Sequence, residues 1–333
     1  MDDSLSVVIV TFNGRALLQT CLDALFRGTR TPDEIIVVDN ASTDGTAAWV
    51  ARTYPGVQVR TCAANLGFAS ANNLGIRASR GAWIMTLNND AWVAPDALER
   101  LLAAIGGVGP PVGAAMSTMV FAGHPAVIAS SGLETFTNGV VRDAGVGEPI
   151  AVDRAPYPVF GPSAGAAVYR RAALDDVGLF DPAFFMYLED ADLAWRLRLR
   201  RWETVAIPSA IVRHAVSATA GYGSPRKAYY LARNRWWCIV KNIPGDLLRE
   251  CAVPIGRSDA AALAYAVATG DGASIAGRRD ALADLPVLRR ARAGVQRGAT
   301  ASRDELRRWL LPAPPLTATL RERRIIRGLI EGR

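Results

Sequence analysis

The stretch SVVIVTFNG at residues 6–14 decides the fold. Its first part, Ser6–Thr11, is a short apolar run, which is typical of a buried strand. Asn13-Gly14 then reads as a turn, and Ala16–Phe26 places its leucines on one face at helical spacing. A buried strand followed by a turn and an amphipathic helix predicts the first unit of an α/β fold.

The same alternation continues through the first hundred residues. Strands are predicted at Glu34–Asp39, Val57–Cys62 and Ala82–Leu87, and helices between them run through Trp49–Arg52 and Ser70–Ala78. Strands that alternate with helices pair in parallel, because each helix carries the chain back across the sheet. We therefore expect an α/β fold with a mainly parallel sheet flanked by helices.

The middle of the chain is less regular. Residues 106–165 are rich in Gly and Pro and are expected to be loop-rich, with short strands at Ala126–Ser130 and Val140–Ala144. A helix is predicted from Phe184 to Leu199, and a strand at Ala206–Val212.

Beyond about residue 208 the composition shifts to Arg and Ala. Helices are predicted at 227–241, 247–252, 258–269 and 302–311, and a last short basic helix after Pro312–Pro315. We expect a domain at 1–215, with halves at about 1–105 and 106–215, followed by a basic helical region at 216–333.

Composition excludes several classes of protein. Half of the 333 residues are hydrophobic, which excludes disorder. The longest apolar stretch, Ala260–Thr269, falls far below the ~20 residues of a membrane-spanning helix. The start at Met1 lacks the basic residues of a signal peptide, so we expect a cytoplasmic protein. The four cysteines form no C-x-x-C pair and are predicted to be buried free thiols.

Charge is distributed unevenly along the chain. Residues 1–199 hold 14 basic and 20 acidic side chains, whereas residues 200–333 hold 24 and 11. A basic region beside an acidic one indicates an anionic partner, either nucleic acid or an anionic membrane surface. The alternative is a solvated surface rich in arginine.

Polar residues recur after successive strands. Thr11 and Asp39 end predicted strands, and Asn65 and Asp90 follow two others. The carboxyl ends of parallel strands line the ligand crevice of an open sheet. A carboxylate there can accept hydrogen bonds from a base or ribose, or hold a hard divalent cation. Asp39 with Asn40 could equally end its strand as a simple turn.

Two phosphate-binding signatures are missing from the chain. The turn Thr11–Arg15 lacks G-x-G-x-x-G, and no G-x-x-x-x-G-K-[ST] occurs anywhere. Dinucleotide-binding and P-loop interpretations therefore lose their support, and a metal ion would have to neutralise any phosphate.

A second group of polar residues is acidic. Glu189, Asp190 and Asp192 lie within four residues at a predicted helix start. The helix dipole favours acids there, so the cluster could be structural. A carboxylate in this position could also act as a general base.

Together these segments resemble family 2 glycosyltransferases of the GT-A fold, in the subgroup that includes bacterial rhamnosyltransferases. The resemblance covers about residues 5–245, and its motifs are VIVTFNG (8–14), VVDNASTDG (37–45), NLGF (65–68), LNND (87–90), GLFD (178–181), FMYLEDADL (185–193), His214 and YYLARN (229–234). The expected fold is the Rossmann-like GT-A fold with a C-terminal helical appendage. The resemblance implies that 1–215 is the catalytic domain, with the nucleotide-sugar half at about 1–105 and the acceptor half at about 106–215.

The resemblance also implies roles for the donor-site residues. The residues expected to hold the nucleotide are Thr11, Asn13, Asp39, Asn65, Asn89 and Asp90. Asn89 and Asp90 occupy the place of the family's D-x-D, where only Asp90 is a carboxylate. His214 matches the position of a further metal ligand, so Asp90 and His214 are the expected ligands of Mg²⁺ or Mn²⁺. His124 has no such context and stays unassigned.

For the transfer itself, the resemblance implies Asp190 as the base of a single displacement with inversion. Crowding by Glu189 and Asp192, with partial burial, is expected to raise the pKa of Asp190 from about 3.9. Glu189 and Asp192 are assigned to acceptor binding or to positioning of the helix.

The expected donor is dTDP-L-rhamnose, because residues 88–90 and 229–234 look most like the rhamnosyltransferase subgroup. UDP-galactofuranose, UDP-glucose or a UDP-N-acetylhexosamine remain open. The expected acceptor is a hydroxyl of a cell-surface polysaccharide or lipid-linked glycan. The alternative to an enzyme is a non-catalytic module that binds nucleotide, glycan or nucleic acid. For the transferase, we expect no nucleic-acid partner. A homodimer is left open.

The basic C-terminal region adds a question of location. Trp236 and Trp237 lie among Tyr, Arg and Lys, as in an interfacial helix, but we expect them to be core residues. The distal cluster of Arg321, Arg323, Arg324 and Arg327 is instead expected to meet an anionic membrane. The enzyme would then be peripheral at the inner face of the plasma membrane.

Overall fold

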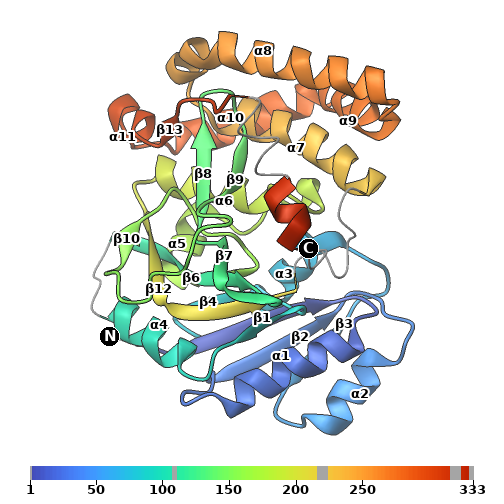
Figure 1. Cartoon of the computed structure of the whole chain (residues 1–333), viewed down its shortest axis with the longest axis vertical. Coiled ribbons are helices and arrows are strands. Elements are labelled where there is room, and N and C mark those ends of the chain that lie inside the picture. Colours follow the sequence, from blue (N-terminus) through green and yellow to red (C-terminus); the bar gives the residue numbers. More distant parts are fainter. Residues whose placement is uncertain (1, 107–110, 216–223, 316–323, 330–333) are drawn as a thin grey trace.

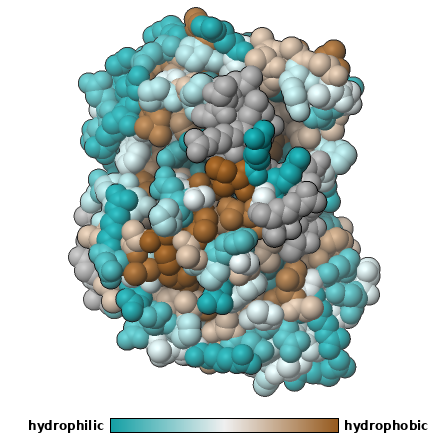
Figure 2. All heavy atoms as spheres, in the orientation of Figure 1, coloured by the Kyte–Doolittle hydropathy of each residue, from teal (hydrophilic) through white to brown (hydrophobic). Residues whose placement is uncertain are grey.

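A computed structural model describes residues 2–106, 111–215, 224–315 and 324–329. A ten-stranded sheet with helices on its faces forms one end of the molecule, and the C-terminal helices stack at the other (Figure 1). Apolar side chains gather in the middle of one face, between the sheet and these helices (Figure 2).

The first half of the sheet is parallel. Its strands lie in the order β3-β2-β1-β4 and have the bounds Leu5–Thr11 (β1), Glu34–Asp39 (β2), Gln58–Thr61 (β3) and Trp83–Asn88 (β4). The helices between them are α1 (Arg15–Arg27), α2 (Thr46–Thr53) and α3 (Gly67–Ala78). The predicted α/β class with helices flanking a sheet is confirmed.

The second half of the sheet mixes directions. Strand β11 (Ala166–Arg170) runs antiparallel between β4 and β6 (Val112–Phe121), and β12 (Glu203–His214) is parallel to β6. The short elements here are β5 (Ala91–Val93), α4 (Ala97–Gly106), β7 (His124–Ser130), β8 (Leu133–Phe136), β9 (Val141–Asp143), β10 (Tyr157–Pro158) and α5 (Arg171–Val177).

The two short strands predicted in this region exist as β7 and β9, but the expectation of mainly loops overlooked β6. All ten residues of β6 are buried. Its sequence VGAAMSTMVF is rich in small residues and Met, which have low strand propensity, so burial between two neighbouring strands decides its conformation.

The helix predicted from Phe184 begins later than expected. Pro182–Phe184 is a 3-10 turn (η1), and Phe185, Tyr187 and Leu188 have φ angles of 62°, 66° and 64°. Helix α6 therefore starts at Glu189 and ends at Leu199, with the three acids in its first turn. Left-handed backbone at non-glycine residues is costly, so surrounding contacts must maintain this loop.

The C-terminal region is helical, as predicted, but differs in its bounds. Its elements are α7 (Pro225–Asn242), α8 (Gly245–Thr269), α9 (Gly272–Ala283), α10 (Leu285–Arg297), α11 (Arg303–Arg307) and β13 (Leu310–Leu311). The helices predicted at 247–252 and 258–269 are one helix that contains Pro254. The helix predicted at 302–311 stops early, because Leu310–Leu311 pairs with β8.

The last basic helix is described over residues 324–329, so Arg321 and Arg323 lie outside the described residues. Within the described part of the chain, no helix is long and apolar enough to cross a membrane.

The C-terminal helices share a hydrophobic core with α6. Trp195 of α6 and Trp237 of α7 belong to one buried cluster, and Trp237 is 3% exposed. Trp237 is thus a core residue, as expected, and Trp236 packs at the edge of the same cluster. The division at 215/216 stays a prediction, and the two proposed parts bury apolar surface against each other.

All four cysteines are free thiols, as predicted. Three of them are buried, but Cys62 is not. It is half-buried just after β3, because this short strand lies at the edge of the sheet. Burial and the neighbouring Asp39 raise the pKa of its thiol.

Candidate active site

Two strand ends meet at one side of the site. Register pairs Thr11 of β1 with Asp39 of β2, and both residues are buried. The backbone N–H of Ser42 donates to Asp39 Oδ1 at 3.2 Å. Asn13 ties the two following loops together, since its Oδ1 accepts from the Thr43 N–H at 2.8 Å and its own N–H donates to Ser42 Oγ at 2.9 Å. The two loops therefore form one wall.

Asn65 joins this wall through Asn40. The Asn40 side-chain amide donates to Asn65 Oδ1 at 3.0 Å, and the same oxygen accepts from the Gly67 N–H at 2.9 Å. Gly67 has a φ of 77°, and a Cβ there would lie 2.5 Å from the Phe185 carbonyl oxygen. The loop after β3 thus packs directly on the loop that precedes α6.

Asn89 and Asp90 follow β4, and strand pairing brings His214 to them. Because β5 pairs with β12, Ala91 lies opposite His214. Asp90 Oδ1 is 3.1 Å from His214 Nε2, although 124 positions separate the two residues. Asn89 turns the other way, and its amide donates to Thr11 Oγ1 at 3.2 Å.

The Asp90–His214 pair has the geometry of a cation site. Two ligands in adjacent octahedral positions, each about 2.1 Å from Mg²⁺, lie about 3.0 Å apart, close to the 3.1 Å found here. A carboxylate oxygen and a neutral imidazole nitrogen repel each other at this distance unless a proton or a cation lies between them.

The protein supplies only part of such a coordination shell. The described ranges contain no group of three or more His, Cys, Asp or Glu side chains that could hold a metal. A cation here would therefore depend on ligands from a bound phosphate.

A chain of hydrogen bonds connects this pair to Asp190. The Asn88 amide nitrogen lies 3.3 Å from His214 Nε2, and the Asn88 backbone N–H donates to the Gly165 carbonyl at 3.0 Å. The neighbouring Ala164 N–H donates to Asp190 Oδ2 at 3.3 Å. Pairing of Thr11 with Asp39 and the hydrogen bond from Asn89 to Thr11 extend this connection, so residues 39, 90, 190 and 214 belong to one set of contacts. These contacts lie at the carboxyl ends of the strands, the edge where an open α/β sheet has its ligand crevice.

Burial and, next, the charge of Asp143 raise the pKa of Asp190 to about 6. Hydrogen bonds from the backbone N–H groups of Ala164 and Ala191 act against this rise. Asp190 is half-buried as a residue, whereas Glu189 and Asp192 on either side of it are buried. A carboxyl with this pKa is a suitable general base near neutral pH.

The two neighbouring acids have different environments. Burial, and then Asp190, raise the pKa of Glu189 well above its usual value, and Glu189 Oε2 has no hydrogen-bond partner among the described residues. Asp192 is fully buried against Arg196, Lys241 and Asn242. Although burial raises the pKa of Asp192, these partners hold it below its usual value.

Sequence reasoning missed the role of Asn234. Its side-chain amide lies at 3.0, 3.0 and 2.8 Å from the carbonyl oxygens of Phe184, Met186 and Tyr187. The Phe185 ring stacks on Tyr230, with 5.4 Å between the centroids. Helix α7 thus holds the left-handed loop that presents Glu189 and Asp190. Asn234 ends the YYLARN motif, which was the available signal.

Asp143 was also missed, and no local pattern identifies it. It is an isolated acid at the end of β9, and its charge acts on both Asp190 and His214.

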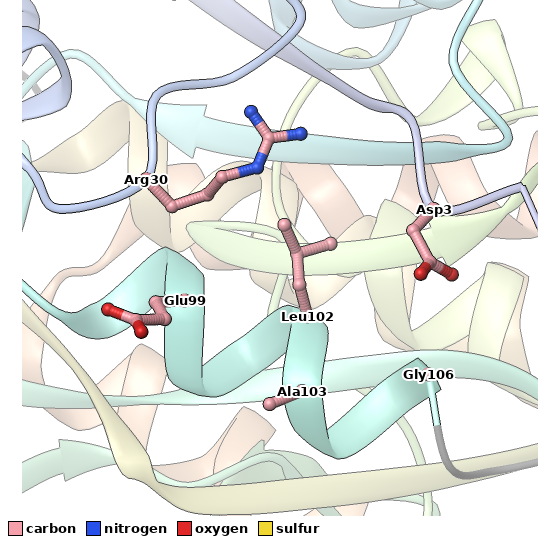
Figure 3. Close-up of a pocket in the computed structure, with 6 residues that line it drawn as sticks. All are labelled: Asp3, Arg30, Glu99, Leu102, Ala103 and Gly106. Carbon is pink, nitrogen blue, oxygen red and sulfur yellow. The ribbon is translucent and has the colours of Figure 1, made fainter.

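A separate hollow lies away from these residues. It measures about 380 Å³ and is lined by Asp3, Arg30, Glu99, Leu102, Ala103 and Gly106 (Figure 3). Asp3 precedes β1, so this hollow lies at the amino ends of the strands, opposite the crevice. None of the candidate site residues described above lines this hollow.

Comparison with known proteins indicates the family and the fold. Residues 6–178 match the family described as Glycosyl transferase family 2. An N-acetylglucosaminyl-diphospho-decaprenol L-rhamnosyltransferase of Mycobacterium tuberculosis is 31% identical over 248 residues, which cover 66% of this chain and 79% of that protein.

Two solved structures share the GT-A fold. A mannosyltransferase from Pyrobaculum calidifontis, in complex with GDP-Man and Mn²⁺, superposes with a TM-score of 0.52 at 20% identity, over 84% of this chain and 87% of that one. GalNAc-T7 with UDP, GalNAc and Mn²⁺ superposes with a TM-score of 0.54 at 16% identity, over 74% and 53% of the two chains.

Proposed function

Since the chain belongs to glycosyl transferase family 2, we propose that it moves a sugar with inversion from a nucleoside diphosphate to an acceptor hydroxyl. One observation carries this proposal: contacts at one edge of the sheet connect Thr11 and Asp39, the Asp90–His214 pair and Asp190, whose pKa is about 6. These are the parts that nucleoside binding, charge neutralisation and proton removal require.

Each proposed role follows from position. Thr11, Asn13, Asp39 and Asn65 would surround the nucleoside, since they form the wall at the ends of β1, β2 and β3. Asp190 would remove the proton from the acceptor hydroxyl as that oxygen attacks the anomeric carbon. The sugar–phosphate bond breaks in the same displacement, so no covalent intermediate with the protein is needed.

The proposed cofactor is Mg²⁺ or Mn²⁺, held by Asp90, His214 and the donor's diphosphate. The 3.1 Å separation of the two side-chain atoms supports it, as does the Mn²⁺ in both solved structures above. Such a cation would stabilise the negative charge that develops on the departing diphosphate. Asn89 would keep its position through Thr11, beside the cation rather than on it.

The proposed donor is dTDP-L-rhamnose. The mycobacterial rhamnosyltransferase, whose name also specifies a diphospho-decaprenol acceptor, supports both the sugar and a lipid-linked acceptor. A UDP-sugar remains the alternative donor. Glu189 would lie beside the acceptor, where burial raises the pKa of its carboxyl, and Asp192 would fix helix α6.

A lipid-linked acceptor would require contact with a membrane, and the basic C-terminal region is the proposed contact. Arg324 and Arg327 are exposed on the last described helical turn. Removal of residues 312–333 should weaken binding to anionic vesicles while turnover with a water-soluble acceptor continues. Unchanged vesicle binding would reject this contact.

Turnover with a panel of sugar nucleotides tests the function. The enzyme is incubated with Mn²⁺, an acceptor and each of dTDP-rhamnose, UDP-galactofuranose, UDP-glucose and a UDP-N-acetylhexosamine, and released nucleoside diphosphate is measured. We expect one donor to exceed the others and Asp190→Asn to lower its turnover by about 10²- to 10⁴-fold. Turnover by Asp190→Asn at the parent rate would reject Asp190 as the base.

The rival function is a non-catalytic module. Such a module would release no diphosphate from any donor. If it bound nucleic acid, the affinity would fall steeply with salt concentration. Metal-dependent thermal stabilisation by dTDP or UDP, without salt-sensitive binding of oligonucleotides, is the result expected for the transferase.

A further inference from the structure

Asp143 places an additional carboxylate at the crevice. It is the last residue of β9, and register pairs it with Leu133 of β8. Its Oδ1 atom is shielded from solvent and has no hydrogen-bond partner among the described residues. The side chains of Ser130 and Ser163 are its hydrogen-bonding neighbours. A shielded carboxylate oxygen without a partner is costly unless a ligand completes it.

The surroundings of Asp143 place it near the segment that contacts Asp190. Leu133, its partner in register, also bridges to Gly161, three residues before Ala164, whose N–H donates to Asp190. Ser163, in the same segment, hydrogen-bonds to Asp143. His214 and Lys227 lie close enough for their charges to lower the pKa of Asp143, although burial raises it overall. Asp143 therefore lies near both the proposed base and His214 of the proposed cation site.

The order of groups in a single displacement identifies what belongs at this place. The attacking hydroxyl, the anomeric carbon and the departing oxygen lie roughly in line. A base stands at one end of this line and the diphosphate at the other. A side chain near both of them lies within reach of the ring of the transferred sugar. Carboxylates bind sugar hydroxyls through short, charge-assisted hydrogen bonds.

We propose that Asp143 binds a hydroxyl group of the transferred sugar and so helps to select the donor. The inference rests on the proposed function, because it requires a sugar nucleotide in the crevice. Asp143 takes no proton in the transfer and forms no bond to the sugar.

Binding measurements separate this role from a structural one. Isothermal titration in Mn²⁺ compares the preferred sugar nucleotide with its free nucleoside diphosphate, using wild type, Asp143→Ala and Asp143→Asn. We expect Asp143→Ala to weaken binding of the sugar nucleotide by about 10- to 100-fold and to leave the free diphosphate within threefold. Asp143→Asn keeps the shape of the side chain, so its affinity for the sugar nucleotide should lie between those of the wild type and Asp143→Ala. Asp153→Ala, an exposed acid of the same region, is the control and should change neither.

Two results would overturn the inference. In one, Asp143→Ala binds both ligands as the wild type does. In the other, it weakens both equally, which would place its effect on the nucleotide or on the fold. Thermal melting of each variant checks folding, and Asp143→Asn should melt at or above the wild-type temperature, because a costly buried carboxylate is removed.

A donor that lacks one hydroxyl provides a second, independent test. If Asp143 binds that hydroxyl, the deoxy donor loses affinity for the wild type but not for Asp143→Ala, and the two changes are not additive. Full additivity for every deoxy donor would reject the contact. Failure of the proposed function looks different, since wild type would then bind neither the sugar nucleotide nor the diphosphate.

Discussion

Replacement of Asn234 by Leu should loosen the loop before α6 and slow the chemical step. The amide of Asn234 has two N–H donors, which serve three carbonyl oxygens at 2.8 to 3.0 Å, and the residue is fully buried. Losing two net hydrogen bonds of about 1 kcal/mol each, and leaving buried carbonyls unpaired, should cost about 3 kcal/mol. Thermal denaturation should show a fall of about 6 °C or more, at about 2 °C per kcal/mol.

The functional effect should exceed the loss of stability. The clamped loop contains three non-glycine residues with positive φ, and Asp190 follows the last of them by two positions. When the loop relaxes, Asp190 moves away from the acceptor, and a displacement of about 1 Å can cost about 10²-fold in turnover. We expect kcat to fall by about this factor, while the Kd of the nucleoside diphosphate, measured by titration, changes less than threefold.

Asn72→Leu is the matched control for this experiment. Asn72 is also buried, but its amide donates to one carbonyl of its own helix, that of Phe68 at 3.0 Å. We expect a cost of about 1 kcal/mol and an unchanged kcat. If Asn234→Leu has the same melting temperature as Asn72→Leu and turns over at the wild-type rate, Asn234 does not hold the loop before α6 in place.

Three further predictions follow from the site. Gly14→Ala places a Cβ 2.3 Å from the Asn89 amide, so it should weaken nucleotide binding at least tenfold by titration. Gly56 has open space around it, so Gly56→Ala should leave nucleotide binding unchanged. Equal effects of the two variants would contradict this packing. Because burial and a neighbouring carboxylate raise the pKa of Asp190 to about 6, its base form is lost as pH falls, and kcat should drop about tenfold per unit below pH 6; a profile flat to pH 5 would refute this. Asp90→Asn should raise the Mn²⁺ concentration for half-maximal turnover at least tenfold, and an unchanged metal requirement would remove Asp90 from the cation site.

The strand ends were predictable from sequence because the signal is local. Asp39 and Asp90 each come directly after a buried strand, and parallel strands bring their carboxyl ends to one edge of a sheet. The local pattern was not enough to predict His214 as a metal ligand, because only the family resemblance distinguished it from His124. The structure explains its place by the pairing of β5 with β12.

Asp143 and Asn234 could not be predicted in this way, because contacts distant in the sequence give them their surroundings. Asn234 meets carbonyl groups 47 to 50 positions earlier in the chain. Asp143 lies 47 positions from Asp190, and the strand predicted at Val140–Ala144 gives no information about which distant residues its side chains meet. A pattern of neighbouring residues contains no information about either contact.

The three acids at the start of α6 show how the fold selects one base from a cluster. Asp192 is ionised by its contacts with Arg196 and Lys241, but it is fully buried and so cannot reach an acceptor. Glu189 is buried without a cationic partner, and burial raises its pKa well above its usual value. Asp190 lies between these limits, because backbone N–H groups offset part of the effect of its burial. Of the three acids, only Asp190 is half-buried and has a pKa of about 6, so it is the one that we propose as the base.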